Sequence, residues 1–222
     1  MRSVVLRPTE RCPRCQLPPR WCVCAGHREI ACALQVDVLM HHRECHRPSS
    51  TGRLIQRTIP ASRQHLWRRE RQLAADEVRQ PGRELWILHP HGEPLPAPPP
   101  PAAGVQILLL DGSWREASAM AQEVGGWGRR ISLPMAGESR YWLRAQAEPG
   151  RFSTVEALLF LLNHFGLNEA HAALRLQFEL HVYASLRSRG RKDDARDFLA
   201  TSPIATECAD LIAALESTRT RE

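Results

Sequence analysis

Apolar residues along the chain gather into short runs, and each run ends in a loop rich in polar residues. The central run, Val105–Leu110, is almost uninterrupted, which predicts a strand buried on both faces of a parallel or mixed sheet. Asp111-Gly112 favours a turn and ends the strand. Ser113 then predicts the N-cap of a helix that runs from Trp114 to about Glu123, with Glu116 completing a capping box.

The same pattern predicts the other elements of an α/β sheet. Shorter apolar stretches predict strands at 33–40, 84–88 and 129–134. The polar segment 53–80 has helical propensity, and Pro81-Gly82 ends it. A strongly apolar helix should begin at Ser153 or Thr154 with Glu156 in its first turn, followed by a second helix over about 168–187. The charged segment from Arg189 onward predicts a tail with a frayed end.

Asp111 is the candidate functional residue that this pattern isolates. It should lie at the carboxyl end of a central strand, above a helix N-terminus, where ligands bind in open α/β sheets. The other interpretation is that Asp111 only closes the turn. Loops that follow the predicted strands at His41–Gly52 and Leu88–Pro90, together with the segment Arg144–Glu156, should meet Asp111 at this edge.

Length and composition indicate a globular chain. A chain of 222 residues with 43% hydrophobic and 24% charged residues fits one α/β domain with a small appendage. We expect a metal-binding segment at 1–30, a catalytic domain at 31–190 and a tail at 191–222. No apolar run approaches the roughly 20 residues that a membrane-spanning helix needs. The first seven residues are too short for a secretory signal, so we expect a cytoplasmic protein that does not engage a membrane.

The charge of the chain favours a nucleic-acid partner. The formal net charge is +6, and Lys192 is the only lysine. Arginine matches phosphate geometry better than lysine does. The densest basic segment holds Arg43, Arg47, Arg53, Arg57, Arg63, Arg68, Arg69 and Arg71, against Glu44 and Glu70. This segment indicates a surface that follows phosphates, although an ordinary solvated helix face remains an alternative.

Four cysteines near the amino end predict a metal site. Cys12, Cys15, Cys22 and Cys24 lie within thirteen positions of a chain that shows no export signal, which favours thiolate ligands over disulfides. Structural zinc in a four-sulfur tetrahedral site fits this set, and free thiols or iron–sulfur ligation are the alternatives. Three further cysteines, Cys32, Cys45 and Cys208, are expected to be free.

Two other segments allow more than one interpretation. His41, His42 and His46 suggest a second metal site, but a supporting position behind the site or an RNA-facing position suits them better, and a packed position suits them best. Pro96 and the run Pro98–Pro101 predict an exposed polyproline linker, with an SH3-type ligand as a minor alternative.

Taken together, these motifs resemble the DTW-domain family, named for an Asp-Thr-Trp signature at a strand end. Here the signature stands as Asp111-Gly112-Ser113-Trp114, in which serine keeps the hydroxyl of threonine. The cysteine cluster, the Ser50-Thr51-Gly52 turn and the Ser153–Ala157 element match in the same order. Ser49-Ser50 stands where the family pattern leads us to expect an asparagine. The likeness covers roughly 12–187.

The resemblance implies a fold and a reaction. The fold would be related to SPOUT methyltransferases, with helices on both faces of the sheet and a carboxy-terminal trefoil knot that periodicity alone cannot reveal. The reaction would transfer the 3-amino-3-carboxypropyl group of S-adenosylmethionine to N3 of a uridine in tRNA, in the variable loop for bacterial members. 5′-Methylthioadenosine would be released. S-adenosylmethionine is thus the expected co-substrate, zinc the expected structural metal and tRNA the expected partner.

The predicted site residues follow from strand-end position and from this likeness. Asp111 is the candidate general base or electrostatic stabiliser of the uridine. The predicted cofactor-binding residues are Leu88, His89, Pro90, Leu110, Gly112, Ser113, Trp114, Leu133, Ser153 and Thr154. The predicted RNA-binding residues are Arg43, Arg47, Ser50, Thr51, Arg53, Arg57 and Arg144. For Trp114, stacking on a base and buried packing are alternatives.

Two other functions remain open from the sequence. A SPOUT-type RNA methyltransferase would use the same donor but deliver its methyl group. A non-catalytic, zinc-stabilised RNA-binding protein would bind no donor and show only salt-dependent RNA affinity. The oligomeric state and the choice of tRNA are not predicted.

Overall fold

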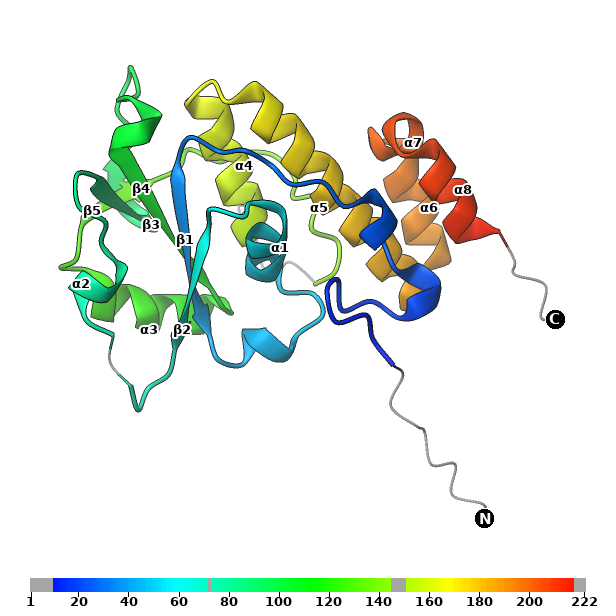
Figure 1. Cartoon of the computed structure of the whole chain (residues 1–222), viewed down its shortest axis with the longest axis horizontal. Helices are drawn as coiled ribbons and strands as arrows, with labels where there is room; N and C mark the ends of the chain where they lie inside the picture. Colours follow the sequence, from blue (N-terminus) through cyan, green and yellow to red (C-terminus); the bar gives the residue numbers. More distant parts are fainter. Residues whose placement is uncertain (1–9, 72, 145–150, 218–222) are drawn as a thin grey trace, which may run out of the picture.

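Five parallel strands form the centre of the molecule. The computed structural model describes residues 10–71, 73–144 and 151–217. Its sheet has the order β2-β1-β4-β3-β5, and every neighbouring pair is parallel. The strands are β1 (Gln35–His41), β2 (Arg63–Trp67), β3 (Glu84–Pro94), β4 (Val105–Asp111) and β5 (Arg129–Ser132). The sequence therefore predicted the α/β class correctly, with β4 near the middle of the sheet (Figure 1).

Eight α-helices accompany the sheet within the described residues. They are α1 (Thr51–Thr58), α2 (Ala75–Val78), α3 (Trp114–Val124), α4 (Thr154–His164), α5 (Asn168–Ser188), α6 (Lys192–Ala200), α7 (Ile204–Glu207) and α8 (Ala209–Glu216). In Figure 1, α4 and α5 lie between the sheet and the group formed by α6, α7 and α8.

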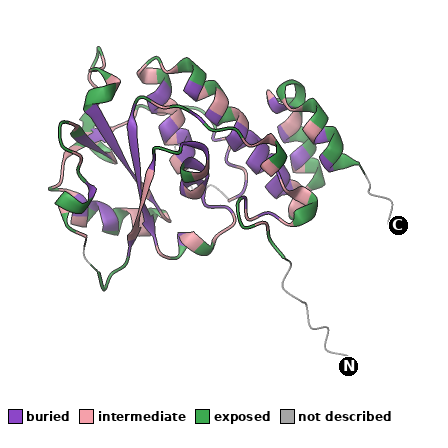
Figure 2. Ribbon diagram, in the orientation of Figure 1, coloured by how far each residue is buried: buried purple, intermediate pink, exposed green. Residues whose placement is uncertain are grey.

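Both faces of the sheet are covered, because alternate residues of the central strands point to opposite layers. On one face, Val38 and Leu109 belong to a large cluster that includes buried residues of α1, α4 and α5. On the other face, Leu39 and Leu108 join Met120 of α3 in a smaller cluster. The two central strands are consequently buried along their lengths (Figure 2).

Strand β4, the Asp111-Gly112 turn and helix α3 have the structure that their sequence predicts. β4 begins at Val105, and α3 begins at Trp114 directly after the Asp-Gly turn. Ser113 caps α3: its Oγ accepts a hydrogen bond from the Glu116 amide, and the Glu116 side chain accepts one from the Ser113 amide. The strands at 33–40 and 129–134 and the helices that begin near 154 and 168 are also confirmed, within two residues at most boundaries.

The helix predicted over 53–80 is wrong. Helix α1 ends at Thr58, and Pro60 follows it. The segment then forms the edge strand β2 and the short helix α2. β2 is only five residues long, and its polar side chains are partly exposed, so it lacks the apolar run or alternation by which a strand is predicted.

Strand β3 is longer than predicted. It continues to Pro94, and its pairing with β5 shifts between Leu88 and Glu93. The intervening residues His89–Gly92 form an irregular projection at the carboxyl edge of the sheet. Gly92 is required there, because a Cβ atom at this position would lie 2.6 Å from backbone atoms of Ile131.

The segment from Lys192 to Ser217, which the sequence predicts to be a tail, is instead folded into the helices α6, α7 and α8. Phe198, Ile204 and Leu215 of α6 to α8 are buried in the same cluster as Leu17 of the cysteine segment. Arg20 Nη2 also donates a hydrogen bond to Ser217 O at 3.1 Å. The domain boundaries predicted at 30/31 and 190/191 remain a prediction. The large hydrophobic cluster includes residues on both sides of each boundary. The first nine residues and the predicted frayed end from 218 lie outside the described residues.

Helices long and apolar enough to cross a bilayer are not found in the described part of the chain.

Candidate active site

Asp111 ends β4 and is held by hydroxyl groups from two helix starts. Its side chain is buried, with 4% of the residue exposed. Ser50 Oγ donates to Asp111 Oδ2 at 2.9 Å, and Thr154 Oγ1 donates to Asp111 Oδ1 at 2.6 Å. Ser50 is the N-cap of α1 and Thr154 is the first residue of α4. Three segments that lie far apart in the sequence therefore meet at one carboxylate.

Gly52 allows α1 to approach this close. A Cβ atom on Gly52 would lie 2.7 Å from Asp111 Cγ and 2.9 Å from Val38 Cγ1, well inside van der Waals contact. The Ser50-Thr51-Gly52 turn thus has two functions in the fold: serine supplies the cap and the hydrogen bond to Asp111, and glycine supplies the space.

Burial raises the pKa of Asp111 above the usual range of a carboxyl, and the nearby charge of Glu44 acts in the same direction. The hydroxyls of Thr154 and Ser50 and the positive charge of Arg144 lower it, but by less. A carboxylate in this environment is a better proton acceptor than an exposed aspartate.

Arg144 is fixed in the wall beside Asp111 by a buried acid. Glu44, which is 1% exposed, accepts a hydrogen bond from Arg144 Nη2 at 2.8 Å through Oε2. Its other oxygen pairs with Arg47. Tyr141, three residues before Arg144, donates from its hydroxyl to Ser49 O. These contacts join the segment before α4 to the loop before α1.

The start of α4 is capped as predicted and leaves part of its helix terminus open. Ser153 Oγ accepts from the Glu156 amide, and Glu156 Oε2 accepts from the Ser153 amide at 2.6 Å. Glu156 also accepts from Ser139 Oγ and from the Arg140 amide. The Glu156 carboxylate is therefore committed to holding the loop 139–140, and the Ser153 and Thr154 hydroxyls are both engaged. Because Ser153 caps the Glu156 amide, the earlier amides of the first turn are the ones directed at the N-terminal end, where an anion would be favoured.

A cavity of about 630 Å³ lies over Asp111 at the carboxyl edge of the sheet. All ten residues predicted to bind the cofactor line it, and so does Asp111. The projection of β3 supplies His89 and Pro90, the Asp-Gly turn supplies Gly112 and Ser113, and the segment after β5 supplies Leu133. The volume falls within the range of pockets that hold cofactors and drug-sized ligands.

Trp114 is the exposed large hydrophobic side chain among the described residues. It lines the cavity but 43% of the residue remains exposed, so it is not a packed core residue. The guanidinium carbon of Arg151 lies 5.0 Å from the centre of its ring. The pair presents an aromatic surface and a positive charge together at the cavity.

The sequence did not single out several further lining residues. Tyr141, Met135, Phe152 and Arg151 line the cavity, and none of them was among the predicted site residues. The polar and aromatic loop 138–144 carried a signal for Tyr141, because buried tyrosines need a hydrogen-bond partner. The others come from irregular segments, whose conformation the sequence pattern does not specify.

The residues predicted to bind RNA divide into three groups. Thr51 and Arg144 line the cavity, and Ser50 holds Asp111. Arg43 is exposed in the loop after β1. The other three, Arg47, Arg53 and Arg57, line a second, narrower cleft beside α1. Their binding to RNA stays a prediction.

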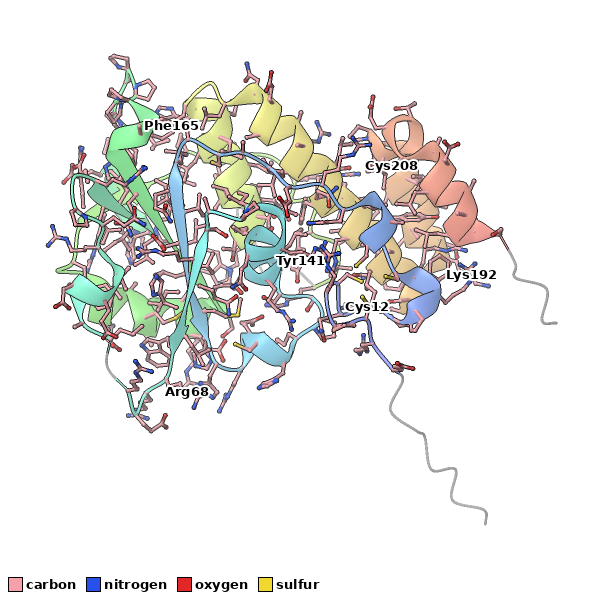
Figure 3. The ribbon with its side chains drawn as sticks, in the orientation of Figure 1. Cys12, Arg68, Tyr141, Phe165, Lys192 and Cys208 are labelled. Atoms are coloured by element: carbon pink, nitrogen blue, oxygen red, sulfur yellow. The ribbon has the colours of Figure 1, made fainter. Side chains whose placement is uncertain are left out.

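The four cysteines form a cluster with the dimensions of a metal site. The Sγ atoms of Cys12 and Cys24 lie 3.7 Å apart, as do those of Cys15 and Cys22. All four sulfur atoms lie within 4.8 Å of one another, and Figure 3 shows yellow sulfur atoms grouped near Cys12. Zinc–sulfur bonds of about 2.3 Å in a tetrahedron would set the sulfurs about 3.8 Å apart. The residues present therefore fit a metal such as zinc.

His41, His42 and His46 are not part of a metal-binding cluster among the described residues. The group close enough to share an ion there is the set of four cysteines. His41 instead is buried, stacks on Trp67 at 5.1 Å and lies 3.3 Å from Glu116 Oε1. The packed interpretation fits His41. Cys32, Cys45 and Cys208 are free, as predicted.

Comparison with known proteins agrees with the geometry. No solved structure matches the chain. The family model for the DTW domain matches residues 9–187, a range that contains the cysteine cluster, Asp111 and the start of α4. With most of its length covered by this model and its signature residues gathered at one cavity, the chain belongs to the DTW domain family.

Proposed function

We propose that this protein transfers the 3-amino-3-carboxypropyl group of S-adenosylmethionine to N3 of a uridine in tRNA. Membership of the DTW domain family is consistent with tRNA modification. The observation that carries the specific proposal is the cavity of about 630 Å³, in whose described lining Asp111 is the one carboxylate, buried and held by Ser50 and Thr154.

The cavity has walls suited to S-adenosylmethionine. Leu88, Leu110 and Leu133 offer apolar surface to an adenosine, with backbone groups of the strand ends beside them. The first-turn amides of α4 suit the carboxylate of the methionine arm, and Arg144 adds a positive charge in the same wall. When bound, the sulfonium supplies an activated carbon and a good leaving group.

Asp111 then has a defined task. Uridine N3 carries a proton and becomes a nucleophile only when that proton leaves. The raised pKa of Asp111 suits a general base that accepts this proton as N3 attacks the γ-carbon. The new N–C bond replaces the C–S bond, 5′-methylthioadenosine leaves, and Asp111 later returns the proton to solvent. Ser50 and Thr154, which donate to its two oxygens, fix the orientation of the carboxylate.

Orientation of the donor decides the product. The γ-carbon and the methyl carbon of the sulfonium are both activated, so the one held in line with N3 reacts. In this proposal, α4 and Arg144 hold the carboxyl end of the arm, which keeps the γ-carbon near Asp111. A methyl-transferring enzyme would need the methyl group at that position instead.

We further propose that the cysteine cluster holds a structural zinc ion and that the fold belongs with the SPOUT enzymes, including their carboxy-terminal knot. The sulfur spacing supports the zinc. The all-parallel sheet, with its candidate site at the carboxyl edge next to the start of α4, supports the proposed SPOUT-type fold.

The test is incubation of the protein with unmodified tRNA and S-adenosylmethionine, followed by mass spectrometry of the nucleosides and of the small-molecule product. The proposal expects acp-modified uridine and 5′-methylthioadenosine in equal amounts. Methylated nucleoside with S-adenosylhomocysteine would establish a methyltransferase instead. RNA affinity without either product would indicate a binding protein.

A further inference from the structure

A second cleft, which we call the arginine cleft, lies where the cysteine segment meets α1 and α5. Arg14 comes from between the cysteines, Arg47 from the loop before α1, Arg53 and Arg57 from α1, and His181 from α5. Ser50, whose hydroxyl holds Asp111, also lines it. The arginine cleft is thus separate from the main cavity. The two are linked through Ser50, which lines the arginine cleft and donates a hydrogen bond to Asp111 in the main cavity.

The arginine cleft carries more positive charge than its surroundings neutralise. Carboxylates are absent from its described lining. Glu44 pairs with Arg47 but also with Arg144, and Glu116 lies 4.0 Å from Arg47 while also facing His41. The cysteine sulfurs attract Arg57. Four thiolates around a divalent ion would carry two negative charges. The four guanidinium groups still exceed what this site and the shared charges of Glu44 and Glu116 offset, and such an excess favours a bound anion.

Two shielded polar atoms of the arginine cleft lack hydrogen-bond partners among the described residues. Arg57 Nε is a donor without an acceptor. His181 is 3% exposed, and its Nε2 lies 3.2 Å from the carbonyl of Pro48, which fixes Nε2 as the donor. Burial and the charge of Arg57 lower the pKa of His181 to about 3, so the ring is neutral and Nδ1 is an acceptor without a donor. Unmet groups of this kind indicate a bound polar partner.

We propose that the arginine cleft binds one backbone phosphate of the RNA substrate. A phosphate oxygen supplies the acceptor that Arg57 Nε lacks, and a water held by the phosphate supplies the donor for His181 Nδ1. The cleft, at about 10 Å³, is now wide enough for little more than one water molecule. The cleft must therefore widen to admit the phosphate, and Arg14 is the exposed arginine of its described lining.

This inference makes the cysteine segment a part of the RNA-binding surface as well as a structural element. Arg14 lies between two of the cysteines, so the metal site would fix the position of an RNA contact. The nature of the anion rests on the proposed function, but its binding is measured without S-adenosylmethionine. Failure of the cleft and failure of the proposed reaction can therefore be told apart.

The experiment measures the affinity of the metal-loaded full chain for an unmodified tRNA transcript at several salt concentrations. Arg14→Gln and Arg53→Gln are compared with Arg196→Gln, which removes the same charge from an exposed position on α6. Each lost phosphate contact should lower the steepness of log affinity against log salt by about 1 and weaken binding about three- to tenfold. The Arg196→Gln protein should behave like the wild type, and metal content is measured for every variant.

Equal salt slopes for the cleft variants and for Arg196→Gln would overturn the inference. So would an Arg57→Gln protein that loses its metal while Arg14→Gln and Arg53→Gln bind tRNA normally, because the arginines would then only neutralise the thiolates. A wild-type chain that shows these slopes but forms no acp-uridine would contradict the proposed reaction and leave the arginine cleft in place.

Discussion

Asp111 is buried and accepts hydrogen bonds from two hydroxyl groups, and the positive charge of Arg144 acts on it from the wall of the cavity. Ser50 and Thr154 fix the direction of the carboxylate, and neither neutralises its charge. Burial consequently dominates and raises the pKa of Asp111. An aspartate placed only to stabilise the fold would gain from a direct ion pair, as Asp37 does with Arg63 in the same sheet. The difference between these two buried aspartates favours a chemical task for Asp111.

Replacing Asp111 by asparagine should remove acp-uridine formation while keeping the fold. Proton transfer by a positioned group contributes about 10² to 10⁴ in rate, so product should fall by at least about a hundredfold. Affinity for tRNA and for S-adenosylmethionine should stay within about twofold, because the amide keeps the shape of the side chain. Product analysis and binding measurements on the same preparation give the result, and near wild-type turnover would remove Asp111 from the mechanism.

The hydroxyl of Thr154 should set the pH at which the enzyme gains activity. The reaction needs ionised Asp111, so activity falls as the pH drops through its raised pKa. The Thr154 hydroxyl lowers that pKa, so Thr154→Val should move the acid limb of the rate profile to higher pH. Thr154→Ser retains the hydroxyl and should leave the limb in place. An unshifted limb in the valine variant would mean that another group titrates.

Trp114 should contribute to RNA recognition, because it is exposed at the cavity with Arg151 against its ring. Stacking of a base on an aromatic side chain is worth about 1 to 3 kcal/mol. Trp114→Ala should therefore raise KM for tRNA by about fivefold or more, and Trp114→Phe should recover much of the loss. A rise confined to KM for S-adenosylmethionine would instead place Trp114 among the cofactor-binding residues, as the sequence predicts.

At the scale of elements, the site depends on how closely α1 approaches the end of β4. The space that Gly52 leaves decides this distance, since an added methyl group would overlap both Asp111 and Val38. The helix cannot retreat freely, because Leu54 and Ile55 on the same helix are buried in the core.

Gly52→Ala should therefore destabilise the protein by about 1 to 3 kcal/mol, the usual effect of forcing extra volume into a packed site. Urea unfolding measures this change. Gly104→Ala is the matched control, because a Cβ atom there meets nothing within 4 Å. Equal stability of the two variants would show that α1 shifts without penalty and would weaken the claim that its position is fixed.

The sequence predicts elements well where local signals agree. The run Val105–Leu110, the Asp-Gly turn and the Ser113 capping box all specify the same strand, turn and helix. β2 was missed because an edge strand of five mostly polar residues has no such pattern. Glu44 was not predicted as a site residue, since only the folded chain brings it to Arg144, one hundred positions later. Long-range pairs of this kind leave no local signal.

At the scale of the whole molecule, the cysteine segment, residues 12–24, is packed against the rest of the fold. Leu17 and Val23 pack into the cluster that also contains buried residues of α5 and α8. Burial opposes ionisation of Cys12, but the amides of Cys15 and Arg14 lower its pKa to about 6. Burial and the neighbouring thiols raise the pKa values of Cys22 and Cys24. The segment is too short to fold on its own core, so the metal should stabilise its contact with the helices.

Removal of the metal by a chelator, or Cys15→Ser, should lower the melting temperature and weaken tRNA binding together. Atomic emission of the purified protein should give about one zinc per chain before treatment. Cys208→Ser is the control, because Cys208 lies outside the cluster. Unchanged stability after complete loss of zinc would show that the cysteine segment folds without it.

The central claim is that Asp111 accepts the N3 proton of a uridine while α4 and Arg144 present the γ-carbon of the donor, and not its methyl group, to N3. Isotope labelling tests it most directly. tRNA is incubated with S-adenosylmethionine labelled either in the methyl carbon or in the aminocarboxypropyl chain, and uridine is recovered for mass spectrometry. We expect label in the nucleoside only from the second donor, and at least about a hundredfold less of it from the Asp111→Asn protein. Label arriving from the methyl carbon, or equal product from that variant, would contradict it.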